Sequence, residues 1–166
     1  MLRVFSRIFN SGPGLTRRSR STHQVHEEIL MGTAVKRSLS AEEVSRRIIT
    51  AAMKVHTAVG PGLLESAYEA CLLHELQIAG LSVASQVPFP LVYNGLKLEV
   101  GYRIDLLVED LVIVEIKCVE AIAPVHKAQL LSYLRLTGRS LGLIINFHVE
   151  HLKDGIRRVV DGYNWK

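Results

Sequence analysis

Asp105, Glu115 and Lys117 have the residue types and the spacing of a hydrolytic metal site. Asp105 lies in one predicted strand, and Glu115 and Lys117 lie in the next, after the tight polar pair Glu109-Asp110. Side chains alternate between the two faces of a strand, so Glu115 and Lys117 share a face, and the hairpin places Asp105 across from them. The sequence therefore predicts two carboxylates and an ammonium group on one face of an otherwise apolar sheet.

A cluster of this kind is costly to bury unless something compensates for its charge. A divalent metal ion is one compensation, because Asp105 and Glu115 supply the hard oxygen ligands that Mg²⁺ prefers, with water and a substrate phosphate in the remaining positions. Lys117 then holds the attacking water or stabilises charge that develops on the phosphate. The alternative is an interior ion pair that has only a structural role.

Two further patterns accompany this cluster. The segment GLLESAY, which contains Glu65 and Tyr68, stands at the head of a predicted helix, where an acid also suits the helix dipole and a tyrosine also suits plain packing. Gln129 and Tyr133 lie one turn apart on one face of a later helix, soon after the strand with Glu115. Each pattern taken alone is compatible with an ordinary surface or core position.

The elements that must position these residues are also visible in the sequence. Ser40 and Glu43 have the spacing of a capping box, and apolar residues then recur at helical spacing. Asn94-Gly95 between two apolar runs is a strong hairpin signal, because both positions tolerate a positive φ. The run 111–118 is apolar on both faces, as a central strand requires. The predicted order is ααββββαβ: helices 41–58 and 63–79, strands 86–93, 96–100, 102–108 and 111–118, a helix 124–137, a strand 140–147, and a last strand or short helix 155–161.

In this combination and order, the motifs resemble the GxxExxY family, a branch of the PD-(D/E)xK nuclease superfamily. The matching residues are Gly62, Glu65 and Tyr68 for the name motif, Asp105 for the superfamily aspartate, Glu115-Ile116-Lys117 for ExK, and Gln129 and Tyr133 for the QxxxY element of RecB-like nucleases. The resemblance spans about residues 42–163. One position departs from the superfamily motif: Ile104, not proline, precedes Asp105.

The resemblance implies an α/β fold of the restriction-endonuclease-like type, in which a central mixed β-sheet is flanked by α-helices. The catalytic set that it implies is Glu65, Asp105, Glu115 and Lys117, of which the three acids bind Mg²⁺ or Mn²⁺. It also implies side chains that contact nucleic acid or order the site: Gln129, Tyr133 and Tyr68.

The leading hypothesis is a metal-dependent nuclease that hydrolyses phosphodiester bonds in DNA or RNA, in repair or defence. The alternative is a catalytically silent module of the same fold that binds nucleic acid or a protein partner. Intact Asp105, Glu115 and Lys117 favour the nuclease, because a binding module does not need all three. Small domains of this kind often cut duplexes as dimers, so a homodimer is one option for the assembly.

Charge is distributed unevenly along the chain. The first 26 residues contain five arginines and no acid, whereas the rest carries 15 basic and 16 acidic residues. The net charge of +4 therefore comes from the N-terminal segment, and the nearly neutral body shows no broad basic footprint for nucleic acid. No stretch reaches the roughly 18 apolar residues of a membrane helix, so no membrane association is expected.

The N-terminal composition predicts a boundary between a basic segment and a folded domain. Residues 1–30 are expected to be a disordered tail or a targeting segment, with Met31 as an alternative start, and residues 40–163 the nuclease-like domain. The expected compartment is the cytoplasm, or the mitochondrial matrix if residues 1–25 are a transit peptide. Cys71 and Cys118 lie in apolar runs without a metal-binding pattern, which indicates free thiols in a reducing compartment.

Overall fold

The computed structural model describes residues 38–162, except for the side chains of residues 99–101. The predicted tail, residues 1–30, lies outside the described residues. In chain order the elements are α2 (Ala41–Val59), α3 (Glu65–Ile78), β1 (Val83–Tyr93), β2 (Leu96–Val108), β3 (Val112–Lys117), α4 (Pro124–Thr137), β4 (Leu141–Asn146), α5 (Leu152–Gly155) and β5 (Ile156–Val160). Within this described range, none of the helices has the length and apolar character of a membrane span.

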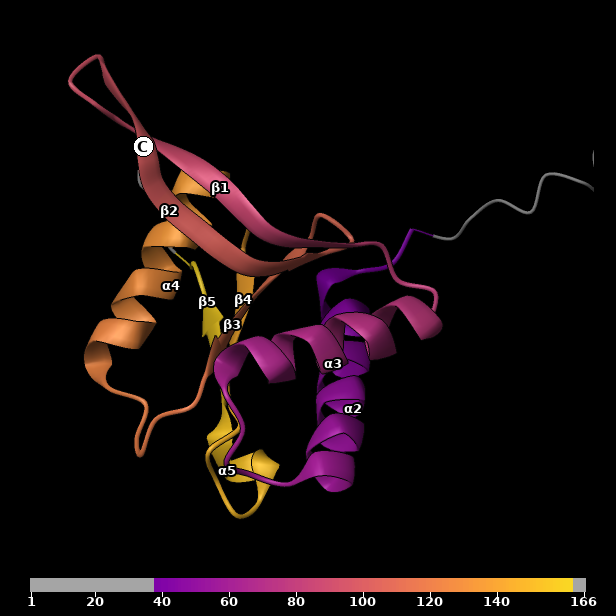
Figure 1. The fold of residues 1–166 in the computed structure, drawn as a ribbon. Coiled ribbons are helices and arrows are strands. Elements are labelled where there is room, and N and C mark those ends of the chain that lie inside the picture. Colours follow the sequence, from indigo (N-terminus) through magenta and orange to yellow (C-terminus); the bar gives the residue numbers. More distant parts are fainter. Residues whose placement is uncertain (1–37, 163–166) are drawn as a thin grey trace, which may run out of the picture. The chain divides into compact units, whose positions relative to one another are not determined.

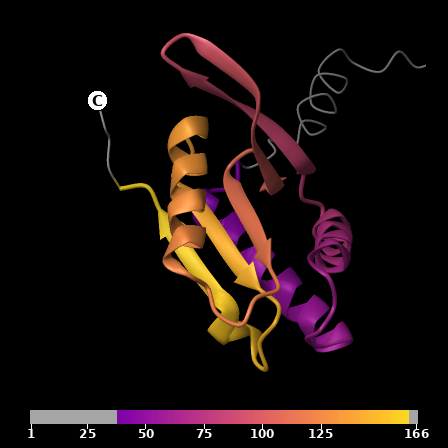
Figure 2. The same ribbon diagram turned by 60° about the vertical axis from the view of Figure 1, so that its left-hand side comes forward.

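A five-stranded sheet in the order β1-β2-β3-β4-β5 forms the centre of the fold. β3 and β4 run parallel, and the other neighbouring strands are antiparallel. α4 lies against one face of the sheet, and α2 and α3 lie against the other (Figures 1 and 2). The predicted α/β class, a mixed sheet flanked by helices in the restriction-endonuclease-like manner, is confirmed.

Local signals account for the helix ends and the tight turns. Ser40 caps α2, since its hydroxyl accepts from the Glu43 N–H at 3.2 Å and its own N–H donates to the Glu43 carboxylate at 2.9 Å. The turn at Asn94-Gly95 has the positive φ angles that its sequence predicted, and the tight turn predicted at Glu109-Asp110 has them as well. These turn residues, with φ of 47°, 81°, 53° and 58°, are Asn94, Gly95, Glu109 and Asp110.

Two predicted elements differ in detail from the structure. The predicted strands 96–100 and 102–108 form one strand, β2, which pairs with β1 on both sides of Gly101. The interruption at Gly101 corresponds to a register shift between the pairs Phe89↔Tyr102 and Leu91↔Leu98. A bulge of this kind bends a strand without ending it. The final segment, predicted as strand or helix, contains both α5 and β5.

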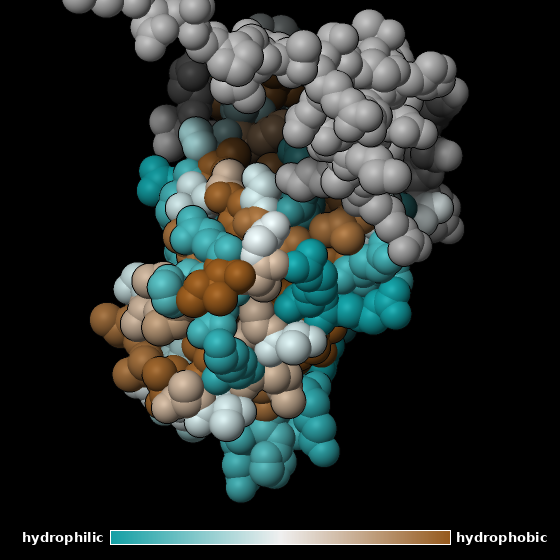
Figure 3. Space-filling model, turned by 90° about the vertical axis from the view of Figure 1, so that its right-hand side faces the viewer, coloured by the Kyte–Doolittle hydropathy of each residue, from teal (hydrophilic) through white to brown (hydrophobic). Residues whose placement is uncertain are grey.

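The sheet separates two hydrophobic cores. The core on the α2/α3 side includes side chains of both helices and of the three strands β2, β3 and β4, among them Tyr68 and Phe147. The core on the α4 side is smaller: Ile104, Ile113, Leu130, Tyr133, Leu134 and Ile144. Hydrophilic and hydrophobic side chains alternate over the outward surface of α2 and α3 (Figure 3).

Candidate active site

Asp105 lies where β2 and β3 separate. The two strands pair from Leu106↔Val114 to Val108↔Val112, and the next position in this register would set Asp105 opposite Glu115. At that point a side-chain hydrogen bond takes the place of backbone pairing between the strands, because Oδ2 of Asp105 accepts the Ile116 N–H at 2.8 Å. The carboxylate is thereby held in the gap between the two strands.

β3 presents Glu115 and Lys117 on the α4 side of the sheet. Ile116 belongs to the core on the opposite side, so the alternation predicted from the sequence is present. The Lys117 ammonium lies 2.7 Å from Oε1 of Glu115, and the Glu115 side chain is only 3% exposed. Oε2 of Glu115 is buried and has no hydrogen-bond partner among the described residues.

The orphaned oxygen is a test of whether this site fits a metal ion. A buried polar atom without a partner is uncommon in folded proteins, and each case requires an explanation. A buried carboxylate oxygen in a group that feels the charges of Asp105 and Glu65 is a suitable ligand for a hard cation. The oxygen donors present are therefore chemically suited to a divalent ion, although no group of three or more His, Cys, Asp or Glu side chains among the described residues is placed so that it could hold one as it stands.

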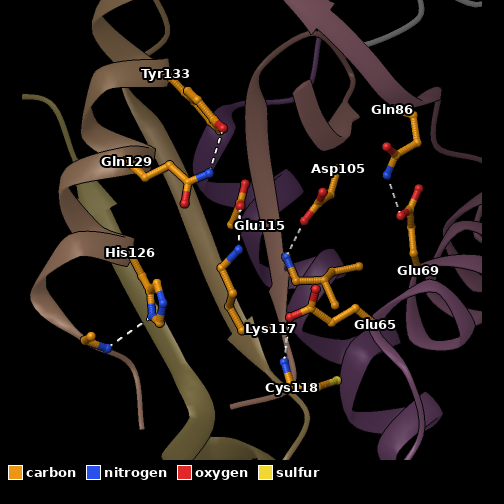
Figure 4. Close-up of polar contacts among 12 residues, drawn as sticks. Glu65, Glu69, Gln86, Asp105, Glu115, Lys117, Cys118, His126, Gln129 and Tyr133 are labelled. Carbon is orange, nitrogen blue, oxygen red and sulfur yellow. Dashed lines mark hydrogen bonds and ion pairs between the residues drawn. The ribbon is translucent and has the colours of Figure 1, made fainter. Parts of the chain in front are cut away.

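Glu65 approaches the same region from the first residue of α3. Its Oε1 accepts the Cys118 N–H at 3.0 Å, just beyond the end of β3. The negative charge of Glu65 contributes to the electrostatics of both Asp105 and Glu115. Figure 4 shows Glu65, Asp105, Glu115 and Lys117 gathered around the end of β3. The structure thus brings together the four side chains that the resemblance selected as catalytic.

Tyr68 has a different location from those four. Its side chain is fully buried and stacks on Phe147, with ring centroids 4.3 Å apart. The Tyr68 hydroxyl donates to the Gly60 carbonyl at 2.7 Å and accepts from the Leu63 N–H at 3.1 Å. These contacts hold the loop that precedes Glu65, so of the two roles implied for Tyr68 its burial is compatible with ordering the site.

Gln129 and Tyr133 lie on the face of α4 that looks onto Glu115 and Lys117 (Figure 4). Nε2 of Gln129 donates to the Tyr133 hydroxyl at 2.7 Å, and the Tyr133 ring meets the edge of Tyr102 at 5.2 Å between centroids. Burial raises the pKa of Tyr133, and the charges of Glu115 and Asp105 add to that increase. The pair therefore forms the α4 wall of the site.

Burial and mutual repulsion shift the pKa values of the acids. Burial first, and the Asp105 charge second, raise the pKa of Glu115 from an ordinary 4.5 to about 7, despite the contact with Lys117. Burial also raises the pKa of Asp105, against the opposing influence of the Ile116 N–H and of Lys117. For Lys117, burial by itself lowers the pKa, but the hydrogen bond to Glu115 and the surrounding carboxylates raise it overall. A cluster of mutually perturbed groups is typical of functional sites.

Two residues beside Asp105, Glu69 and Gln86, were not predicted from the sequence. Oε2 of Glu69, one turn after Glu65 in α3, accepts from Nε2 of Gln86 in β1 at 2.6 Å. The Asp105 charge contributes to the raised pKa of Glu69, after burial and against the Gln86 hydrogen bond. The i, i+4 spacing of Glu65 and Glu69 was the available signal for Glu69. Gln86 had none, because its proximity depends on strand pairing.

His56 lies in α2 and is buried. Its Nε2 lies 2.9 Å from the Val149 carbonyl oxygen, and its ring lies beside Phe147. His126 lies at the first turn of α4, where its Nδ1 accepts the Ala123 N–H at 3.1 Å (Figure 4). Both histidines therefore use one ring nitrogen for a contact with the backbone.

Comparison with known proteins identifies one matching family. The model of the PD-(D/E)XK nuclease superfamily matches residues 42–159, most of the chain. Among solved structures, the chain is similar to one titled "Crystal structure of SSO0001", with 16% identity, a TM-score of 0.43, and coverage of 86% of this chain and 76% of that chain. None of the curated proteins matches.

Proposed function

The chain belongs to the PD-(D/E)XK nuclease superfamily, and we propose that it is a metal-dependent nuclease that hydrolyses phosphodiester bonds in DNA or RNA. The observation that carries the proposal is Glu115: a buried carboxylate with one oxygen on Lys117 and the other unpartnered among the described residues, beside Asp105. Structural ion pairs are stable only when their remaining atoms are satisfied. A ligand that binds the unpartnered oxygen of Glu115 is therefore the simplest explanation for a charged residue at this buried position.

Asp105, Glu115 and Glu65 are the residues proposed to hold the ion, and Mg²⁺ suits their oxygen atoms, with Mn²⁺ as a substitute. A divalent ion at such a site supplies Lewis acidity and compensates for negative charge on the substrate phosphate. The raised pKa of Glu115 means that its carboxyl group must lose a proton before it can act as a ligand. Ion binding is accordingly expected to strengthen as the pH rises through about 7.

Lys117 is the catalytic residue proposed to hold the attacking water or to stabilise the charge that develops on the phosphate. Its ammonium is largely buried and already oriented by Glu115, so little reorganisation is needed when negative charge develops on the phosphoryl oxygens. Gln129 and Tyr133 line the same face and are proposed to orient the nucleic-acid backbone or the Glu115 carboxylate. Tyr68 is proposed to act by holding the loop in front of Glu65.

Within the superfamily, we assign the chain to the GxxExxY branch from Gly62, Glu65 and Tyr68, with a role in repair or defence.

An open hollow of about 610 Å³ beside Glu65, lined by residues that include Leu64, Cys118 and His148, gives a nucleic-acid strand room next to the proposed metal ligands. A homodimer that cuts both strands of a duplex is the proposed assembly.

A cleavage assay on the full chain tests this function. Plasmid, single-stranded DNA or RNA should be degraded in Mg²⁺ or Mn²⁺, and a chelator should stop the reaction. Asp105→Ala and Glu115→Ala should abolish cleavage and leave binding intact or tighter, because each removes a negative charge that repels the phosphates. The exposed Asp154 in α5 provides a matched control, and Asp154→Ala should retain full activity.

Nucleic-acid binding without metal-dependent cleavage of any of the three substrates, unchanged by these substitutions, would contradict the proposal. A catalytically silent binding module would then be the better description. The contact of Glu65 with the Cys118 N–H is the observation that favours this second function, since it already satisfies one oxygen of a proposed ligand.

For the remainder of the chain, we propose that residues 40–163 form the nuclease-like domain and that residues 1–30 are a basic tail or a targeting segment. The arginine-rich and acid-free composition of the N-terminal residues supports this division. A targeting role would bring the protein to the mitochondrial matrix, and a plain tail would leave it in the cytoplasm. Deletion of residues 1–30 should change the midpoint of thermal unfolding by no more than about 2 °C, and a drop of many degrees would contradict the division.

A further inference from the structure

Strands β1 and β2 exchange sheet faces beside the proposed metal ligands. In β2, Ile104 packs in the core on the α4 side, whereas Leu106 packs in the core on the α2/α3 side, although residues two apart in a regular strand share a face. In β1, Val83 and Val87 are divided between the two cores in the same way. Asp105 lies at the point of exchange in β2.

Gln86 is the residue of β1 at this point. The pairs Ser85↔Leu106 and Val87↔Ile104 set Gln86 opposite Asp105. Its φ of 52° is left-handed, a backbone conformation that a residue with a Cβ rarely adopts. A single residue outside the β region breaks the alternation of side chains, and this explains the exchange of faces in β1; the exchange in β2 occurs directly opposite, at Asp105. Because of the exchange, the Asp105 carboxylate lies within electrostatic range of Lys117 on the α4 side and of Glu65 in α3.

The side chain of Gln86 joins this point of the sheet to α3. Its amide donates to Glu69 at 2.6 Å, and Glu69 lies one helical turn after Glu65 on the same helix (Figure 4). The Asp105 charge is felt by Glu69 as well as by Glu65, so this turn of α3 is close to the gap between β2 and β3. Holding Glu69 near Asp105, in addition to Glu65 and Glu115, adds repulsion to the metal-free cluster.

We propose that Glu69 and Gln86 are positioning residues: their hydrogen bond fixes α3 over the strand gap and so sets the place of Glu65 relative to Asp105. The inference rests on the proposed function for its consequence, which is the affinity of the site for a divalent ion. Partners of metal ligands commonly affect ion affinity by about 10- to 100-fold without touching the ion. Glu69 itself need not contact the ion or the substrate.

Two backbone amides report the positions of the carboxylates directly. The Cys118 N–H donates to Glu65, and the Ile116 N–H donates to Asp105. The experiment measures hydrogen exchange at both amides in the metal-free full chain. In Glu69→Ala and in Gln86→Gly, the Cys118 amide should exchange roughly 3- to 10-fold faster, the effect of losing about one hydrogen bond. The double variant should show no further increase, because both changes remove the same contact.

Three comparisons separate positioning from general loosening of α3. Glu69→Gln should preserve slow exchange at Cys118, since an amide oxygen still accepts from Gln86. Glu75→Ala removes the contact of α3 with Lys54 elsewhere on the helix and should leave the Cys118 amide unchanged. Gln86→Gly is preferred to alanine because glycine keeps the left-handed backbone without strain. Titration with Mn²⁺ alone should show about tenfold weaker binding in the variants that release Cys118.

Unchanged exchange of the Cys118 amide in both Glu69→Ala and Gln86→Gly overturns the inference, whether or not the chain cleaves nucleic acid. Faster exchange with unchanged Mn²⁺ affinity overturns the stated link between the pair and the ion. A failure of the unaltered chain to bind Mn²⁺ overturns the proposed function instead, and the exchange rates then still decide whether the pair positions Glu65.

Discussion

Glu115 and Asn146 are buried to the same extent on neighbouring strands, yet only the side-chain polar atoms of Asn146 are all hydrogen-bonded. Each residue is 2% exposed, and β3 and β4 pair in parallel across this part of the sheet. The Asn146 amide donates to the Val119 carbonyl at 2.7 Å and accepts from the backbone N–H groups of Val119 and His148. Glu115 contacts Lys117 through one oxygen and leaves the other without a partner among the described residues.

The difference separates a structural polar residue from a functional one. Asn146 satisfies its own hydrogen-bonding groups and those of the loop after β3, so it stabilises the fold by itself. Glu115 adds charge to a region that already contains Asp105, and burial raises its pKa to about 7. A residue that costs stability in the isolated protein is expected to contribute when a ligand is present. Substitutions around Glu115 should therefore lower activity more than stability, and substitution of Asn146 should lower stability.

The largest effect is expected at Lys117, the only partner of Glu115 within the described contacts. Lys117→Ala should slow cleavage by roughly 10²- to 10³-fold, the scale of one preorganised electrostatic group. Single-turnover cleavage rates at saturating Mg²⁺ measure this loss. Lys54→Ala, which removes an exposed lysine from the ion pair with Glu75, is the matched control and should leave the rate unchanged. A loss below threefold in Lys117→Ala would indicate that the Lys117–Glu115 pair, like Asn146, has only a structural role.

Asn146→Ala should lower the free energy of unfolding by about 2–4 kcal/mol, because it leaves the Val119 and His148 backbone groups without their buried partner. The loss should be equal at pH 5 and pH 8, since an amide does not titrate. Urea unfolding at the two pH values measures it. A loss that grows with pH would show that Asn146 is coupled to the charged cluster and would weaken the contrast with Glu115.

Glu115→Gln should show the opposite sign and a clear dependence on pH. The pKa of Glu115 is raised in the folded chain, from 4.5 to about 7, so the folded state holds a proton that the unfolded state has lost between these values. Stability of the metal-free protein therefore falls as pH rises from about 4.5 to 7, and the cost is complete above 7. The substitution should stabilise the protein by about 1–3 kcal/mol at pH 8 and by almost nothing at pH 5. Equal effects at both values would refute the raised pKa.

Gln129 and Tyr133 provide an intermediate case and the smallest expected effect. Their mutual hydrogen bond resembles the satisfied contacts of Asn146, but it faces Glu115 and Lys117. Tyr133→Phe removes one hydroxyl from this wall and should reduce the cleavage rate by roughly 3- to 10-fold, with little change in stability. Ser132→Ala, on the neighbouring position of α4, removes a hydroxyl that bonds only within the helix and should have no effect.

Local sequence signals determined most of the architecture. The capping box at Ser40, the turn at Asn94-Gly95 and the pair Glu109-Asp110 each depend on a few consecutive residues, and all three appear as predicted. The two-residue period of β3 likewise separated Glu115 and Lys117 from Ile116. The predicted break in β2 was the exception, because pairing with β1 continues past the irregularity near Gly101.

Tertiary structure decided what the periodic pattern could not express. A perfect alternation of Ile104, Leu106 and Val108 predicts a common face, but the structure divides them between the two cores at Asp105, opposite the left-handed Gln86 of the partner strand. Packing also buried Tyr68 beneath its loop and set Glu69 beside Asp105. Periodicity and capping are properties of neighbouring residues, and the sequence by itself determined them. The pairing of strands and the packing of a helix on the sheet depend on contacts between residues far apart in the chain. Only the folded structure therefore decided which side chains meet at Asp105.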